Sequence, residues 1–238
     1  MSALRFADNV QYSYGNNQIG AGFLALPENP SGDLLPAMVV IQEIWGHNED
    51  IRSITRRFAE QGYATFAPDL YHGSQSLDLE EARKFSAAMQ MDVAELELDM
   101  AIRYLRSLQD VDKRFAGIIG FCMGGSLAMR MAIRATMPAT LEVSAAAIFY
   151  GGTPPPKDQD LSMIRCPLFC AYGDQDTGIS NEQIESLRTS LRNNHVSSEI
   201  HIYPGVGHSF FNSAKPESYN EPAAEQAWQD VLRFFSKH

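Results

Sequence analysis

The alternation of short apolar runs with longer stretches of helical periodicity is the feature that most constrains the fold of this chain. The apolar runs have the length of strands, whereas the stretches between them repeat apolar residues every three or four positions. Predicted strands cover residues 37–44, 63–71, 115–120, 144–152, 167–174 and 198–205, and predicted helices cover residues 48–62, 93–108, 126–135, 181–194 and 224–235. This order predicts the α/β class, with a mainly parallel sheet covered by helices on both faces. Residues 18–27 predict an antiparallel strand that precedes this unit.

Length and composition favour one domain over residues 1–238, because the chain has no repeat and no linker and is long enough for one core. With 19 basic and 29 acidic residues, the formal charge of −10 argues against nucleic acid or an anionic membrane as a partner. Three cysteines are an odd number and too few for a disulfide scaffold, and the first residues lack a signal-peptide core. We therefore expect a cytoplasmic protein, and the sequence does not indicate its oligomeric state.

Cys122 stands in a turn flanked by glycines. The segment GFCMGG (120–125) follows a predicted strand and precedes a predicted helix, which is the context that the G-x-S-x-G turn requires, here with sulfur in place of oxygen. The glycines are needed because the nucleophile of such a turn sits in a strained bend where side chains two positions away would meet the adjoining backbone. The N-terminus of the following helix favours a developing negative charge. The pattern predicts Cys122 as a nucleophile.

Asp176 and His208 follow two other predicted strands, in the segments GDQD and GVGHSFF. The order nucleophile, acid, histidine is that of the α/β-hydrolase arrangement, and ligands of open α/β sheets gather at the ends of the strands. Asp174 competes with Asp176 for the role of the acid, but Asp174 is better suited to the turn itself. We therefore predict that Cys122, His208 and Asp176 act together.

Buried cysteines and ordinary histidines are the alternative interpretation of these residue types. A lone cysteine after a strand is often a small buried hydrophobe, and we apply this interpretation to Cys166 and Cys170, which have no partner at zinc-ligand spacing. For Cys122, the glycine pattern together with Asp176 and His208 favours catalysis. The remaining histidines are interpreted as surface, loop or core groups: His47, His72, His195, His201 and His238.

Five segments together resemble the dienelactone hydrolases (carboxymethylenebutenolidases) of the α/β-hydrolase superfamily. They are VVIQEIWG, APDLY, IIGFCMGG, YGDQD and GHSF, and the resemblance runs from about residue 37 to 211. A cysteine in the turn together with a glutamate at the end of the first core strand is a pairing that serine esterases lack. The resemblance implies a single-domain α/β-hydrolase fold and hydrolysis of a small lactone or carboxylic ester.

Residue roles carry over from this resemblance. It implies that Cys122 is the nucleophile, His208 the base and Asp176 its orienting acid, and that Glu43 pairs with the resting thiol and helps to pass its proton. It places the oxyanion hole on the backbone N–H groups of Ile44 and Met123. Taken alone, Glu43 would be interpreted as a strand-end carboxylate that faces solvent.

Substrate binding is the part of the family pattern from which this sequence departs. The family commonly holds a substrate carboxylate with an arginine four residues after the histidine, and this position is Asn212 here. A second arginine-bearing stretch corresponds to LDLEEARKF, where Arg83 or Lys84 could serve. Trp45 and Tyr71 are expected to form apolar walls of the binding pocket.

Sulfur chemistry points to the same substrates without the family name. A thiolate is a strong nucleophile and also a good leaving group, so a cysteine enzyme suits esters whose own leaving group is stable, such as the enol of an unsaturated lactone. We expect hydrolysis through a thioester, with no metal and no organic cofactor. The alternatives are a broad-specificity carboxylesterase or thioesterase, and a non-catalytic ligand-binding or thiol-sensing protein.

Overall fold

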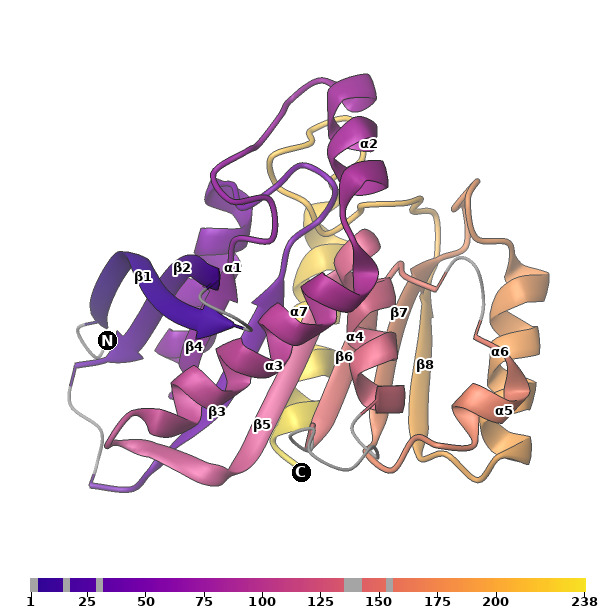
Figure 1. Cartoon of the computed structure of the whole chain (residues 1–238). Helices are drawn as coiled ribbons and strands as arrows, with labels where there is room; N and C mark the ends of the chain where they lie inside the picture. The colour runs from indigo at the N-terminus through magenta and orange to yellow at the C-terminus, as the bar shows by residue number, and fades with distance from the viewer. Residues whose placement is uncertain (1–3, 15–17, 29–31, 135–142, 153–155) are drawn as a thin grey trace. The chain divides into compact units, whose positions relative to one another are not determined.

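The computed structural model describes residues 4–14, 18–28, 32–134, 143–152 and 156–238 (Figure 1). Its contacts divide the chain into two compact units, Met1–Ile118 (unit 1) and Ile119–His238 (unit 2). The boundary falls within one strand, β5 (Val111–Phe121). The organisation of the chain as one domain therefore stays a prediction.

Unit 1 contains the strands β1 (Leu4–Tyr14), β2 (Gln18–Pro27), β3 (Leu35–Ile41) and β4 (Ala64–Pro68), which are ordered β1-β2-β4-β3-β5. The strand β2 is antiparallel to both β1 and β4, whereas β3 and β4 are parallel. This confirms the antiparallel strand predicted over residues 18–27. The strand β1 was not predicted, because most of its residues are only partly buried or exposed and carry no continuous apolar signal.

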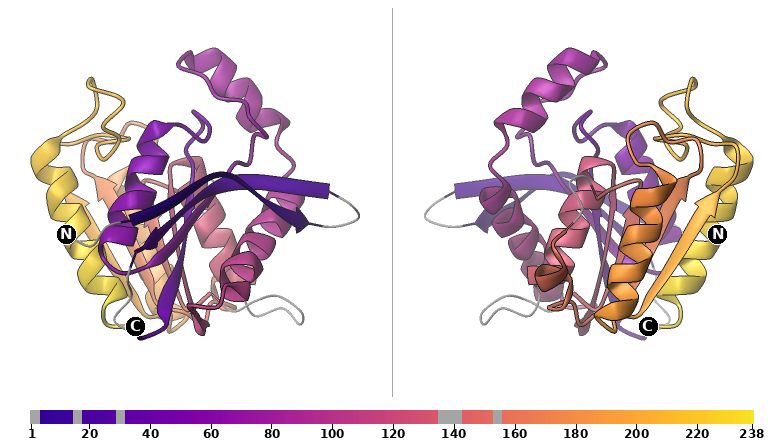
Figure 2. Two further views of the ribbon diagram at one scale, coloured as in Figure 1. Left: turned by 90° about the vertical axis from the view of Figure 1, so that its left-hand side faces the viewer. Right: turned by 90° about the vertical axis from the view of Figure 1, so that its right-hand side faces the viewer.

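Two helices cover the strands of unit 1 on opposite faces, α1 (Glu49–Glu60) and α3 (Met91–Ser107), as Figure 2 shows. The helix α1 begins where the side chain of Asn48 accepts a hydrogen bond from the N–H of Ile51 (3.2 Å), and it buries Ile51, Ile54 and Phe58. A third helix, α2 (Leu79–Ala88), buries only Ala82. It was not predicted because it has no apolar stripe.

Unit 2 contains β6 (Ala145–Phe149), β7 (Leu168–Gly173) and β8 (Ser198–Tyr203), which are parallel to one another and follow in the order β5-β6-β7-β8. Its helices are α4 (Met123–Arg134), α5 (Asp158–Leu161), α6 (Asn181–Asn193) and α7 (Glu221–Phe235). The helix α7 lies on one face of these strands and α4 and α6 lie on the other (Figure 2). Because β6 and β7 are buried on both faces, their sequences are apolar throughout.

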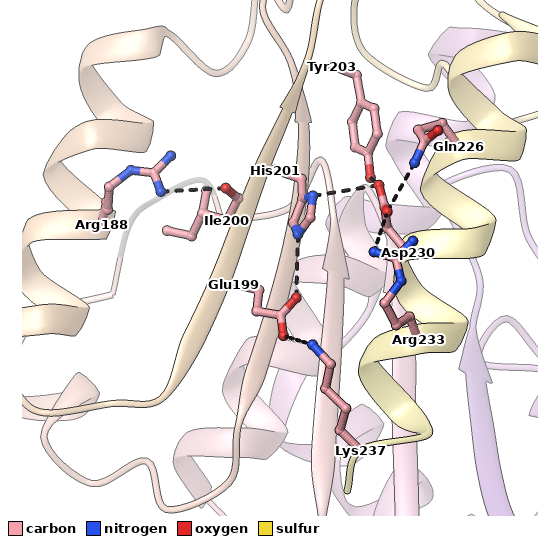
Figure 3. A network of polar contacts seen from close by, with 9 residues as sticks. All are labelled: Arg188, Glu199, Ile200, His201, Tyr203, Gln226, Asp230, Arg233 and Lys237. Atoms are coloured by element: carbon pink, nitrogen blue, oxygen red, sulfur yellow. Dashed lines mark hydrogen bonds and ion pairs between the residues drawn. The ribbon is translucent and has the colours of Figure 1, made fainter.

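A buried carboxylate ties the last strand of unit 2 to α7 (Figure 3). The side chain of Asp230 on α7 is 7% exposed and accepts hydrogen bonds from the hydroxyl of Tyr203 (3.0 Å) and from Arg233 (3.1 Å). Nδ1 of His201 lies 3.6 Å from the same carboxylate. Tyr203 ends β8, so these contacts fix the strand end from which the loop carrying His208 departs.

The described residues contain eight strands, which are mainly parallel, and seven helices, and this confirms the predicted α/β class. Within these residues, none of the helices has both the length and the apolar character needed to span a bilayer.

Candidate active site

Cys122 occupies the bend between β5 and α4 in unit 2, with its backbone in the left-handed region at φ = 53°. The N–H of Cys122 donates to the carbonyl oxygen of Phe149 at the end of β6 (2.9 Å), and its carbonyl oxygen accepts from the N–H of Ser126 in α4 (3.1 Å). A non-glycine residue at positive φ is uncommon and costs about 1–3 kcal/mol when the surrounding structure holds it there. Cys122 is half-buried, whereas Cys166 and Cys170 are buried.

The glycines around Cys122 are required by close backbone approaches. A Cβ atom on Gly120 would overlap the carbonyl group of Gly124. A Cβ atom on Gly125 would lie 2.8 Å from the carbonyl oxygen of Phe149 and 3.0 Å from Cα of Gly151. The predicted reason for the glycine at position 120, a clash with adjoining backbone, is therefore confirmed.

Asp176 and His208, which lie in the loops after β7 and β8, are in direct contact. Nδ1 of His208 lies 2.7 Å from Oδ2 of Asp176, and Oδ1 of Asp176 accepts the N–H groups of Gly178 (2.8 Å) and Ile179 (3.1 Å). The Asp176 side chain is fully buried and that of His208 is 36% exposed. Asp174 instead accepts the N–H of Gly205 (2.7 Å), which is a turn contact.

Opposing effects set the charges of this pair. Burial tends to raise the pKa of Asp176, but the hydrogen bonds from His208, Gly178 and Ile179 outweigh burial and leave the pKa below its usual value. Burial likewise tends to lower the pKa of His208, but hydrogen bonds and charges from Asp176 and Cys122 raise it to about 10. The hydrogen bond between His208 and Asp176 favours the protonated ring beside the Asp176 carboxylate.

Tyr150 is a residue of this site that the sequence did not single out. It follows β6 with φ = 36°, is 1% exposed, and its ring centroid lies 5.0 Å from that of His208. Its position directly after a buried strand, before two glycines, was the available signal. Tyr150 limits the directions in which the imidazole can turn.

Glu43, Ile44 and Trp45 follow β3 in unit 1. Glu43 is 2% exposed, so the alternative of a solvent-facing carboxylate is wrong. Ile44 and Trp45 are half-buried, and the carbonyl oxygen of Trp45 accepts the N–H of Ser76 (3.1 Å). The segment is thus held against the loop that follows β4.

The other two predicted binding residues of unit 1 have different surroundings. Tyr71 is 8% exposed and its ring packs 5.7 Å from that of Phe85 on α2. Arg83 also lies on α2, and its side chain is 64% exposed and pairs with Glu80 (3.0 Å). A role of either residue in substrate binding stays a prediction.

Asn212 in unit 2, at the position where the family commonly has an arginine, has a structural role. It is 2% exposed, its Oδ1 accepts the N–H of Ala214 (3.0 Å), and its own N–H donates to the carbonyl oxygen of Ser209 (3.0 Å). These bonds stabilise the turn that follows His208.

The described residues hold no group of three or more histidine, cysteine, aspartate or glutamate side chains suited to a metal ion.

The fold and the site define the class of α/β hydrolases. In a mainly parallel α/β fold, a cysteine lies at the strand–helix turn and is followed along the chain by a hydrogen-bonded aspartate and histidine. Comparison with known proteins narrows this class. The sequence model of the dienelactone hydrolase family matches residues 21–238, and the chain belongs to this family.

Relatives and solved structures agree with this assignment. Two relatives carry the name "Putative carboxymethylenebutenolidase". The one from Synechocystis sp. is 34% identical to this chain, and the one from Yersinia pestis is 32% identical. The matches cover 90% and 91% of this chain and 90% and 83% of the relatives, respectively. The crystal structure of a "Putative Dienelactone Hydrolase" from Klebsiella pneumoniae superposes with a TM-score of 0.86 at 26% identity, and covers 99% of this chain and 100% of the other.

Proposed function

We propose that this protein hydrolyses a small lactone or activated carboxylic ester through a thioester on Cys122. The observation that carries the proposal is the 2.7 Å contact of His208 with Asp176, in the same unit as Cys122 at its strained strand–helix turn. Membership of the dienelactone hydrolase family supports hydrolysis as the type of reaction.

In the proposed cycle, His208 or Glu43 takes the proton of Cys122, and the thiolate attacks the substrate carbonyl carbon. The N–H groups of Ile44 and Met123 donate to the oxyanion, and one such donor is typically worth about 3–4 kcal/mol of barrier. The carbon–oxygen bond of the ester breaks, the proton taken from Cys122 passes to the leaving oxygen, and the lactone ring opens as the thioester forms, which leaves His208 neutral. His208, oriented by Asp176, then deprotonates a water molecule that releases the acid.

The acceptor set of Asp176 supports its orienting role. Two backbone N–H groups hold Oδ1, so Oδ2 is directed at the imidazole and fixes which ring nitrogen carries the hydrogen. The other ring nitrogen is left to exchange a proton with the thiol. Met123 is the first residue of α4, where the positive end of the helix dipole favours an oxyanion.

The substrate is expected to have a stable leaving group and an apolar body. A thiolate departs readily from a tetrahedral intermediate, so plain alkyl esters and amides should return to substrate more often than they react. Trp45 and Tyr71 are proposed as apolar walls, and Arg83 as a partner for a substrate carboxylate.

A broad-specificity carboxylesterase or thioesterase is the second candidate, and Asn212 is the observation that favours it. The side chain of Asn212 is committed to a turn, so this position offers no cation to a substrate carboxylate. A panel with and without a carboxylate separates the candidates: a dienelactone-type enol lactone, an uncharged aryl ester, a thioester and an alkyl ester.

Trapping the acyl-enzyme tests the mechanism. The protein is mixed with an activated aryl ester, quenched in acid during the first turnover and analysed by intact mass and peptide mapping. We expect a mass increase of one acyl group on Cys122, which Cys122→Ala loses and Cys166→Ala keeps. Turnover by a folded Cys122→Ala variant would refute the nucleophile, and folded wild type without ester turnover would favour a non-catalytic protein.

A further inference from the structure

Unit 1 contains a cavity that shares Tyr71 with the proposed substrate site but holds none of the proposed reacting groups. Its volume is about 360 Å³. The walls come from the end of β1, the loop after β4, the helix α2 and the first turns of α3, all labelled in Figure 1. Aromatic and aliphatic side chains form most of its lining, including Tyr14, Tyr71, Phe85, Met89 and Val93.

Glu97 of α3 brings a carboxylate to this apolar lining. Its side chain is 2% exposed, and its Oε1 lies 3.2 Å from Nε2 of His72. Tyr14 also lines the cavity, and its ring stacks on that of His72 with centroids 6.2 Å apart. Among the described residues, Oε2 of Glu97 has no hydrogen-bond partner. A buried carboxylate oxygen without a donor is costly, and Glu97 is one of the residues that line the cavity.

The charges around Glu97 favour a cation as the missing donor. Burial and, to a smaller extent, the nearby carboxylate of Asp69 raise the pKa of Glu97 to about 7, against the lowering effects of His72 and Tyr14. Tyr12 faces the same carboxylate, and burial and Glu97 raise its pKa also. None of the described residues that line the cavity is a lysine or an arginine, so the carboxylate of Glu97 disfavours an anionic ligand here.

We propose that this cavity binds a small organic ammonium ion, with the ammonium group donating to Oε2 of Glu97 and the apolar body against Tyr71, Phe85 and Val93. Ammonium ions are attracted to the faces of aromatic rings, and the attraction grows when both groups leave water. The volume is in the range of small-molecule sites, and a ring with a one-carbon arm fits it. The proposal concerns unit 1 alone and does not depend on the reactivity of Cys122.

Three probes of similar size and different charge test the site by isothermal titration calorimetry: benzylamine, benzyl alcohol and benzoate. At pH 8, where Glu97 is ionised and benzylamine is protonated, we expect benzylamine to bind more tightly than benzyl alcohol and benzoate not to bind. Lowering the pH below 7 protonates Glu97 and should weaken benzylamine binding by about tenfold per pH unit. None of the probes is an ester, so a failed hydrolysis assay leaves this result unaffected.

Glu97→Gln keeps the shape of the side chain and removes its charge. We expect this variant to bind benzylamine at least ~10-fold more weakly, the loss of about one charge-assisted hydrogen bond, with little change for benzyl alcohol. Glu95→Gln is the matched control, because Glu95 is also buried on α3, 7% exposed, but does not line the cavity. It should bind benzylamine like wild type.

A second variant keeps the test decisive if Glu97→Gln does not fold. Ala88 is exposed on α2 and lines the cavity, so Ala88→Trp should obstruct the cavity without changing its buried carboxylate. It should weaken the binding of benzylamine and benzyl alcohol together. The proposal is wrong if folded wild type does not bind benzylamine, if benzoate binds as tightly, or if both variants bind benzylamine like wild type.

Discussion

Gly125→Ala tests whether the backbone that holds Cys122 tolerates a displacement. The added Cβ atom would lie 2.8 Å from the carbonyl oxygen of Phe149, the acceptor of the Cys122 N–H hydrogen bond. An ordinary contact at this place is about 3.4 Å, so one of the two segments must move by roughly 0.6 Å. Both segments are backbone and neither can turn aside as a flexible side chain could.

Two effects on stability oppose each other in this variant. Overpacking costs about 1–3 kcal/mol, whereas replacing a glycine inside α4 by alanine gains about 1 kcal/mol of helix propensity. We therefore expect a net loss of about 0–2 kcal/mol, which lowers the melting temperature by a few degrees, roughly 2–4 °C per kcal/mol for a chain of this size.

The effect on activity should be larger than the effect on stability. A displacement of 1 Å in a reacting group can reduce a rate by about 100-fold, so roughly 0.6 Å at the turn of Cys122 should lower kcat/KM by about tenfold, or ~1.4 kcal/mol. The assay is hydrolysis of an activated aryl ester, with the concentration of folded enzyme taken from far-ultraviolet circular dichroism.

Gly62→Ala is the control for a loss of stability without displacement of the site. Gly62 has φ = 93° and open space around its Cα, so an alanine there costs about 1–2 kcal/mol through backbone strain alone. It should lower the melting temperature and leave kcat/KM unchanged. If Gly125→Ala keeps the kcat/KM of wild type, the hydrogen bond between Cys122 and Phe149 does not position the nucleophile, and our account of the turn is refuted.

Three further predictions concern the thiols and the pair of Asp176 and His208. Iodoacetamide at pH 8 should label Cys122 and spare Cys166 and Cys170. Burial raises the pKa of Cys166 and Cys170 to about 12, which leaves about 10⁻⁴ of each as thiolate. Peptide mapping that finds either buried thiol labelled first would contradict this. Asp176→Asn should lower kcat by about 10²–10⁴-fold through loss of the ring orientation, and a loss of less than tenfold would exclude the orienting role. Because the pKa of His208 is raised to about 10, the stabilisation by its charged form is complete below its usual pKa and is lost as the pH rises through about 10. Urea unfolding of wild type between pH 6 and 10.5 should show this decline, and Asp176→Asn should flatten it.

The predicted strands agree with the structure best where both faces of a strand are buried. The strands β6 and β7 are apolar at nearly every position, and their residues could only be buried. Among the elements that were missed, β1 and α2 lie with much of their surface exposed, so side chains on their outer positions follow no apolar pattern. Their structure depends on pairing and packing partners that are distant in the sequence.

Part of the candidate site was predictable because its residues follow strands that have a clear apolar signal. Cys122, Asp176 and His208 each follow a buried strand, and the order of strands brings such positions to one edge. The cavity beside Glu97 was not predictable, because it needs residues from β1, from α2 and from the loop after β4. Neither β1 nor α2 was predicted. His72 was interpreted as an ordinary surface, loop or core histidine, and its contact with Glu97 has no counterpart in local sequence.

Three residues around the imidazole of His208 have a strained backbone, which their residue types do not indicate. Cys122 after β5, Tyr150 after β6 and Ser209 beside His208 have φ values of 53°, 36° and 60°, and none of them is a glycine. Each such residue costs about 1–3 kcal/mol, and its replacement by glycine would remove much of that cost. Strain of this kind persists where the surrounding contacts require the conformation. Here the three strained residues lie at or beside the Cys122 thiol and the His208 imidazole, whose positions the proposed proton transfer would require to be fixed. A turn that only reversed the chain would gain stability from glycine at these positions. The presence of larger side chains at all three positions favours a site whose geometry matters more than its stability.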